Sequence, residues 1–104
     1  MTEIAETSET LRLALPDHPP DVRQKAIILW SSLQAGSRPP DLLRLLEHWL
    51  RDPHTPPSVR IACFWGLLDA GGLPRERWPA PRTFENIDHD IPWELVDEVL
   101  LGDF

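Results

Sequence analysis

One short pattern occurs twice in the chain, at positions 35 residues apart. The copies are Trp-Ser-Ser-Leu-Gln-Ala-Gly at 30–36 and Trp-Gly-Leu-Leu-Asp-Ala-Gly at 65–71. Each copy is preceded by a proline pair and a Val-Arg dipeptide, at 19–23 and at 56–60. Repeats of this period are typical of stacked helical hairpins, because one hairpin alone cannot bury its apolar face. The repeat therefore predicts an architecture and a role in binding, but no reaction.

Twelve prolines divide the chain into proline-free stretches. Proline is tolerated in the first turn of a helix and disfavoured in its interior. We therefore expect helices over about 3–15, 20–35, 40–51, 57–70 and 92–101, and no strands, since period-2 alternation and hairpin-turn dipeptides are absent. The predicted fold is a single all-α domain over 1–104. It has two stacked hairpins over 3–72, a Pro-rich extended arm over 73–91, and an acidic C-terminal helix and tail over 92–104.

The spacing of apolar residues predicts which helix faces are buried. In the helix over 20–35 the predicted core face contains Val22, Ala26, Leu29, Trp30 and Leu33. In the helix over 40–51 it contains Leu42, Leu45, Leu46, Trp49 and Leu50. The helix over 57–70 is apolar on all sides, so we expect it to be buried all round, with Trp65 in the core.

The two units also resemble a known repeat family. A proline-bearing turn, an Asp or Ser, and Val-Arg open a helix that closes on Leu-x-Ala-Gly, at 21–36 and at 58–71. This arrangement resembles the second helix of a HEAT repeat, and the helix over 40–51 takes the place of that family's first helix. The distance from Val-Arg to Trp differs by two residues between the units. The resemblance covers about 3–72, and it implies protein–protein interaction, because HEAT proteins are mostly binding scaffolds.

The charge of the chain is unevenly distributed. The net charge is −7, yet residues 11–82 hold all ten Arg and Lys against seven acids. Residues 83–104 hold seven acids and no Arg or Lys. This pattern counts against direct nucleic-acid binding, which needs a basic surface. The N-terminus lacks the order of a signal peptide, no apolar run approaches the roughly 20 residues of a membrane span, and Cys63 is the only cysteine, so we expect a cytoplasmic protein without a membrane segment.

No residue pattern predicts a reaction. Asp88-His89-Asp90 is a compact acidic cluster, but metal binding needs three or four converging ligands, and we expect no metal and no cofactor. Cys63 lies in the most apolar stretch, without a base beside it, which favours a buried residue over a nucleophile. Ser31-Ser32 does not lie in a Gly-x-Ser-x-Gly turn. We therefore expect no enzymatic activity.

The C-terminal arm is the candidate partner-binding segment. Residues 83–104 contain ten large apolar residues as well as their acids, which is unlike a disordered solubility tail. We expect the arm to cover the helix over 57–70 and to turn its acids outward, although the sequence leaves open whether the arm binds a partner or only covers that helix. The candidate residues are Asp88, Asp90, Trp93, Glu94, Asp97, Glu98, Asp103 and Phe104.

The predicted function is a non-catalytic protein-binding module or a small acidic inhibitor. Its partner would be a protein with a basic surface, for example one that handles nucleic acid, as for immunity proteins, antitoxins and anti-defence inhibitors. The alternative is a structural or self-associating scaffold subunit of a larger assembly, in which the helix over 57–70 packs against another copy.

Overall fold

The computed structural model describes residues 15–79 and 86–102. Its regular elements are α2 (Pro20–Leu33), α3 (Pro40–Arg51), α4 (Pro57–Ala70), the 3-10 turn η1 (Arg75–Arg77), α5 (Ile87–Asp90) and α6 (Trp93–Leu101). Every regular element in this part of the chain is helical, which confirms the predicted all-α class. The helix expected over 3–15 lies outside the described residues, apart from its last position.

The proline pairs set the starts of the three long helices. Each of α2, α3 and α4 begins at the second proline of a pair, where the missing N–H costs no hydrogen bond. Asp21 and Asp41 lie in the first turns of α2 and α3, where the helix dipole favours a negative charge. Proline therefore fixes where these helices begin, as the sequence predicts.

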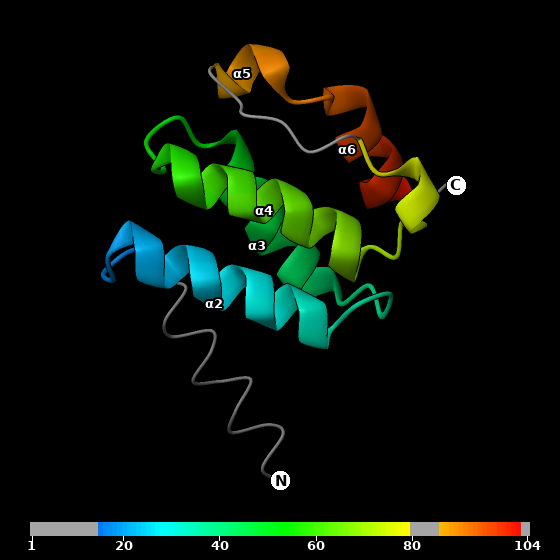
Figure 1. The fold of residues 1–104 in the computed structure, drawn as a ribbon, viewed down its shortest axis with the longest axis horizontal. Helices are drawn as coiled ribbons and strands as arrows, with labels where there is room; N and C mark the ends of the chain where they lie inside the picture. Colours follow the sequence, from blue (N-terminus) through cyan, green and yellow to red (C-terminus); the bar gives the residue numbers. More distant parts are fainter. Residues whose placement is uncertain (1–14, 80–85, 103–104) are drawn as a thin grey trace, which may run out of the picture.

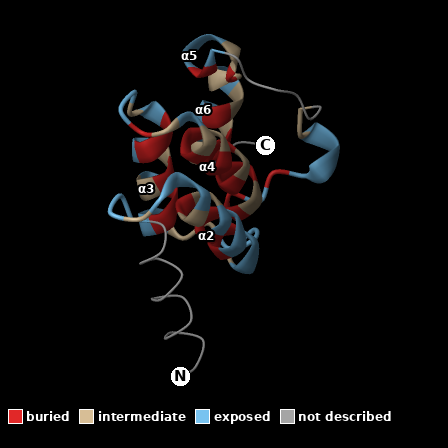
Figure 2. Ribbon diagram, turned by 60° about the vertical axis from the view of Figure 1, so that its left-hand side comes forward, coloured by how far each residue is buried: buried red, intermediate tan, exposed pale blue. Residues whose placement is uncertain are grey.

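Helix α4 lies at the centre of the molecule. It runs side by side with α2 in the same direction, while α3 lies behind the pair and runs the opposite way (Figure 1). Helices α5 and α6 pack on the side of α4 away from α2, in both views (Figures 1 and 2). The buried side chains concentrate on α4 and on the faces turned toward it (Figure 2), which agrees with the prediction that α4 is buried all round.

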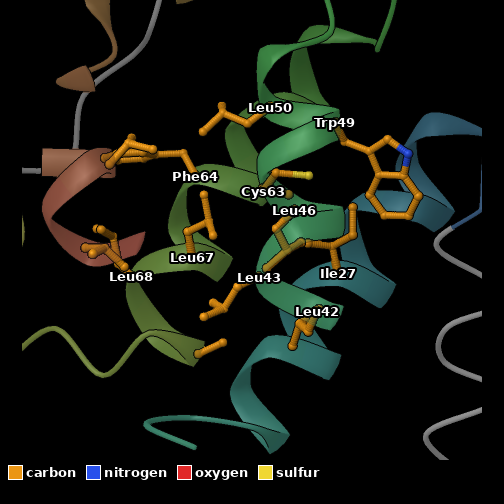
Figure 3. Close-up of a cluster of buried hydrophobic side chains, with 14 of the residues drawn as sticks. Ile27, Leu42, Leu43, Leu46, Trp49, Leu50, Cys63, Phe64, Leu67 and Leu68 are labelled. Carbon is orange, nitrogen blue, oxygen red and sulfur yellow. The ribbon is translucent and has the colours of Figure 1, made fainter. Parts of the chain in front are cut away.

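The core forms where α2, α3 and α4 meet. Ile27 of α2 points toward Leu42 and Leu46 of α3, and Leu67 of α4 lies in the same layer (Figure 3). All four side chains are at most 2% exposed. The predicted stripe on α3 is correct except that Leu45 is only half-buried.

The structure aligns α2 with α4 in a register different from that of the Trp-containing pattern. When the two helices are matched by their Val-Arg dipeptides, 37 positions apart, every buried position of α2 is also buried in α4. These pairs are Arg23 with Arg60, Ala26 with Cys63, Ile27 with Phe64, Trp30 with Leu67, and Ser31 with Leu68. The two registers differ by two residues, which is about 200° around a helix, so the matching tryptophans point in different directions.

Two predictions about buried faces are therefore wrong. Leu29 and Leu33 were expected in the core but are 55% and 59% exposed. Trp65 is half-buried, and its ring stacks on that of Trp78 with 5.8 Å between the ring centroids. Helical spacing alone cannot choose between neighbouring phases of a helix that is apolar on several sides.

The loop between α2 and α3 seals the end of α4. The backbone N–H groups of Gly36 and Arg38 donate to the carbonyls of Asp69 and Ala70, and Nη1 of Arg38 donates to the carbonyl of Gly71 at 2.7 Å. Nη2 of Arg38 also donates to the carbonyl of Leu100 in α6. Carbonyls at a helix end need such donors, so Arg38 joins the ends of α4 and α6.

The described parts of the segment over 73–91, residues 73–79 and 86–91, are less extended than expected. They contain η1 and the single helical turn α5, while the residues around Pro74 and Trp78 keep the extended backbone typical of proline-rich sequence. A one-turn helix is too short to leave a periodic apolar pattern, so the sequence gives no signal for α5.

Candidate functional site

The acidic arm, by which we mean residues 83–104, has a buried inner side in its described part, 86–102. Val96 and Val99 of α6 are 0% exposed, and Ile87 and Ile91 around α5 are also buried. Phe64 and Leu68 lie on the side of α4 that faces α6 (Figure 3). The described part of the arm is therefore ordered and covers α4, as the sequence predicts.

The outer side of the arm forms ion pairs with the rest of the chain. Oδ1 of Asp97 accepts from Nη2 of Arg51 at 3.0 Å, and Oε2 of Glu98 accepts from Nη2 of Arg77 at 2.7 Å. All four side chains are between 43% and 63% exposed, so each pair contributes at most about 1 kcal/mol to stability. The uneven charge of the sequence is thus partly balanced within the fold.

A third ion pair involves a buried arginine. Arg60 of α4 is 5% exposed, and its Nε donates to the carbonyl of Leu50 at 2.8 Å. Its Nη2 donates to Oδ1 of Asp88 at 2.6 Å. Arg60 therefore connects the end of α3 to α5.

Arg23, at the matching position of α2, is also buried, and its guanidinium lies 5.2 Å from the ring centroid of Trp49.

Trp93 in the acidic arm and Trp78 in the segment before it each fix the local course of the chain. Nε1 of Trp93 donates to the carbonyl of Asp88, and Arg51 lies over its ring. Nε1 of Trp78 donates to the carbonyl of Leu73, while the ring is stacked on Trp65. Both indoles are thus used to fix the chain.

The remaining candidate residues occupy different environments. Glu94 is exposed and makes no ion pair or hydrogen bond with the described residues. Oδ2 of Asp90 accepts from the N–H of Asn86 at the start of α5. Asp103 and Phe104 lie outside the described residues. Asp88, Asp97 and Glu98 each keep one carboxylate oxygen that no contact above uses, and a carboxylate has about four acceptor sites in all.

The described residues give no sign of metal or thiol chemistry. Among them, no three His, Cys, Asp or Glu side chains gather closely enough to hold a metal ion. Burial in the apolar interior raises the pKa of the Cys63 thiol to about 12, so the thiol stays protonated at neutral pH. Burial also lowers the pKa of Arg23 from its ordinary value.

Sequence reasoning missed a groove between α2 and the end of α4. It measures about 290 Å³ and is lined by Ile28, Ser31 and Ser32 of α2, by Trp65, Gly66 and Asp69 of α4, and by Arg75 and Trp78. The guanidinium of Arg75 lies 4.3 Å from the ring centroid of Trp78. The sequence signal for this groove was Trp78, a tryptophan in a proline-rich segment. Only the fold brings Trp78 beside Trp65.

Comparisons with protein-family profiles, curated proteins and solved structures find no match for this chain. In the part of the chain that the structure describes, no helix combines the length and apolar character needed to cross a bilayer.

Proposed function

We propose that this protein is a non-catalytic protein-binding module whose acidic arm docks on a basic protein partner. The observation that carries the proposal is the two-sided character of α6. Its Val96 and Val99 are fully buried, whereas Glu94, Asp97 and Glu98 are exposed along its outer side. A fixed row of carboxylates loses little conformational entropy on binding, which favours association.

The internal ion pairs are compatible with this function. Exposed pairs contribute little to stability, so a partner's arginine or lysine can share or replace Arg51 and Arg77 at small cost. A row of acids also steers a basic partner during encounter. Small acidic inhibitors that block a basic, nucleic-acid-handling protein are the function class that best fits this charge pattern.

The HEAT-like pattern over 3–72 gives independent support for a binding role. The parallel, adjacent packing of α2 and α4 is the relation expected between second helices of stacked units. We therefore favour a binding protein over an enzyme.

The test uses a fluorescent peptide rich in Arg and Lys, with an acidic peptide of equal length for comparison. A variant with Glu94→Gln, Asp97→Asn and Glu98→Gln should bind the basic peptide more weakly than the wild type and with a flatter salt dependence. The matched control carries Asp17→Asn, Asp21→Asn and Asp41→Asn, three exposed acids that lie before the arm in the sequence, and so has the same net charge. Equal loss of binding in both variants would mean that net charge alone acts, and would contradict the proposal.

A further inference from the structure

The groove between α2 and the end of α4, which we call the tryptophan groove, contains charged groups of both signs. Among the described residues that line it, Asp69 is the one acid and Arg75 the one base. The carboxylate of Asp69 makes no ion pair or hydrogen bond with any described residue. The guanidinium of Arg75 lies over the ring of Trp78 and pairs with no described acid. The groove therefore holds an acid and a base that do not contact each other.

Asp69 lies where a cation is favoured. It belongs to the last turn of α4 (Pro57–Ala70), and the dipole of a helix favours positive charge at its C-terminal end. The side chain is also half-buried, and charges attract each other more strongly where water is partly excluded. A cation in the groove would thus be attracted by the carboxylate and by the helix end together.

The indole rings favour a planar cation. Trp65 and Trp78 both line the groove, and their rings are stacked with 5.8 Å between the centroids. A guanidinium is planar and weakly hydrated, so it stacks on aromatic rings more readily than the ammonium group of lysine does. Arg75 makes this kind of contact within the chain, since its guanidinium lies 4.3 Å from the ring centroid of Trp78. The rings therefore favour arginine over lysine as the bound cation.

Ser31 adds a hydrogen-bonding group that the described residues leave unused. It lines the groove, and its Oγ is buried without a partner among the described residues. Gly66 lies against this oxygen from α4 and has no side chain that could donate to it. A guanidinium has five N–H donors in one plane, which is enough for a carboxylate and for a hydroxyl oxygen. A ligand with such donors would supply the hydrogen bond that Ser31 lacks.

The size and place of the groove indicate that the cation belongs to a protein. The volume of about 290 Å³ lies at the lower end of the roughly 300–1,000 Å³ typical of small-molecule pockets, so it suits a single side chain. The groove also adjoins the acidic side of α6. Trp78 directly follows Arg77, whose Nη2 donates to Oε2 of Glu98 at 2.7 Å. One protein bound along α6 can therefore reach the groove across η1.

We propose that the tryptophan groove receives one arginine side chain of the basic partner, whose guanidinium binds the carboxylate of Asp69 and lies against the indole rings. This contact rests on the proposed function, because it belongs to the same partner. Arginine and tryptophan are enriched among the residues that dominate binding energy in protein interfaces. The groove selects arginine, while the acids of α6 attract basic charge in general.

Arg75 makes the charge of the bound group testable. Its guanidinium lies over the ring of Trp78 and repels a second cation, so Arg75→Gln should tighten the binding of arginine several-fold. A carboxylate or phosphate ligand would instead lose the one cation that lines the described groove, and Arg75→Gln would weaken its binding. Weaker arginine binding by this variant overturns the proposal.

Titration of the isotope-labelled full chain with Nα-acetyl-arginine amide tests the groove without the partner. In nuclear magnetic resonance spectra the indole N–H signals of Trp65 and Trp78 should shift, while that of Trp49, which is buried in the core, should not. The citrulline analogue has the same shape without the charge, and it should bind about tenfold more weakly. Unchanged signals of Trp65 and Trp78, or equal binding of the two analogues, overturn the proposal.

Two variants of equal charge test the role of Asp69. Asp69→Asn should bind the arginine analogue about tenfold more weakly than the wild type. The control Asp41→Asn removes an exposed acid that does not line the groove, and it should bind as the wild type does. Circular dichroism should show the same helix content in all three proteins, because neither side chain belongs to the core. Equal binding by the two variants overturns the proposal.

The fluorescent basic peptide distinguishes this contact from the proposed function. Asp69→Asn and the variant with Glu94→Gln, Asp97→Asn and Glu98→Gln should each weaken peptide binding, and a peptide of arginines should bind the wild type more tightly than one of lysines. If only the α6 variant loses affinity, the groove contact is overturned and the proposed function stands. If only Asp69→Asn loses affinity, the groove contact is supported and the role of the α6 carboxylates is contradicted.

Discussion

Arg60 is buried in α4, yet it donates a hydrogen bond of 2.6 Å to the exposed carboxylate of Asp88 in α5. The two ends of this pair are unequal. The guanidinium also donates to the carbonyl of Leu50, whereas the Asp88 side chain is 67% exposed to solvent. Removing the Arg60 side chain therefore leaves a cavity in the interior. Removing the charge of Asp88 leaves Arg60 with its hydrogen bond to the carbonyl of Leu50.

We predict that Arg60→Ala lowers the free energy of unfolding by about 3 kcal/mol, because it leaves a cavity and an unpaired buried carbonyl. Asp88→Asn should cost about 1 kcal/mol, since the exposed amide can still accept a hydrogen bond. Urea denaturation of the two variants measures both values. Equal losses would show that the pair, and not the buried arginine, holds α5 in place.

The raised pKa of Cys63 predicts a loss of stability in alkali. The thiol of the unfolded chain ionises from about pH 8.5, while the folded chain keeps its proton until about pH 12. Between these values the folded state binds more protons, so stability falls as pH rises, by up to about 1.4 kcal/mol per pH unit. Urea denaturation between about pH 7 and pH 10 should show this slope. The control Cys63→Ala should be less stable at neutral pH and should lack the slope.

The contact of Gly66 with Ser31 predicts opposite effects for two small changes. Among the described residues, Oγ of Ser31 is buried and has no hydrogen-bond partner. Ser31→Ala should therefore raise the free energy of unfolding by about 1 kcal/mol, because a buried hydroxyl without a partner is costly. Gly66→Ala should lower the free energy of unfolding by about 1–3 kcal/mol through overpacking, although alanine has a higher helix propensity than glycine. Thermal melts decide both signs, and a more stable Gly66→Ala would mean that α2 can move away at little cost.

The two sides of α6 predict a contrast within the arm. Val96 is fully buried against α4, whereas Leu101 is mostly exposed. Val96→Ala should cost about 2 kcal/mol from lost burial and a residual cavity, while Leu101→Ala should change stability by less than about 0.5 kcal/mol. Chemical denaturation of both variants tests whether the arm is part of the cooperative core. A neutral Val96→Ala would show that α4 does not need this cover.

Sequence reasoning succeeded where the signal is local. The proline pairs located the starts of α2, α3 and α4, and the all-round apolar character of α4 predicted its central place. The prediction of which face of α2 is buried was wrong for Leu29 and Leu33, because these leucines suit a core face as well as Ile27 does. The burial of Arg23 and Arg60 was also missed, since periodicity counts arginine as polar, although the repeated Val-Arg dipeptide marked both positions.

The candidate site was predictable in composition but not in contacts. The acids and apolar residues of 83–104 predicted an ordered arm over α4. Their pairing with Arg51, Arg60 and Arg77 was not predictable, because these arginines lie 21 to 46 residues from their partners. Such pairs arise only when the chain has folded. The assignment of the carboxylates to a basic partner stays a prediction.

The cover that α5 and α6 place over α4 has a consequence during synthesis. The ribosome makes Phe64 and Leu68 before it makes Val96 and Val99, so the far side of α4 emerges without the residues that later bury it. A chain of this kind can collapse early around α2, α3 and α4, but it presents apolar surface to the cell until the arm has been translated. We expect the nascent chain to be a substrate for chaperones over that interval, and codon changes that delay translation between 71 and 86 to increase its aggregation.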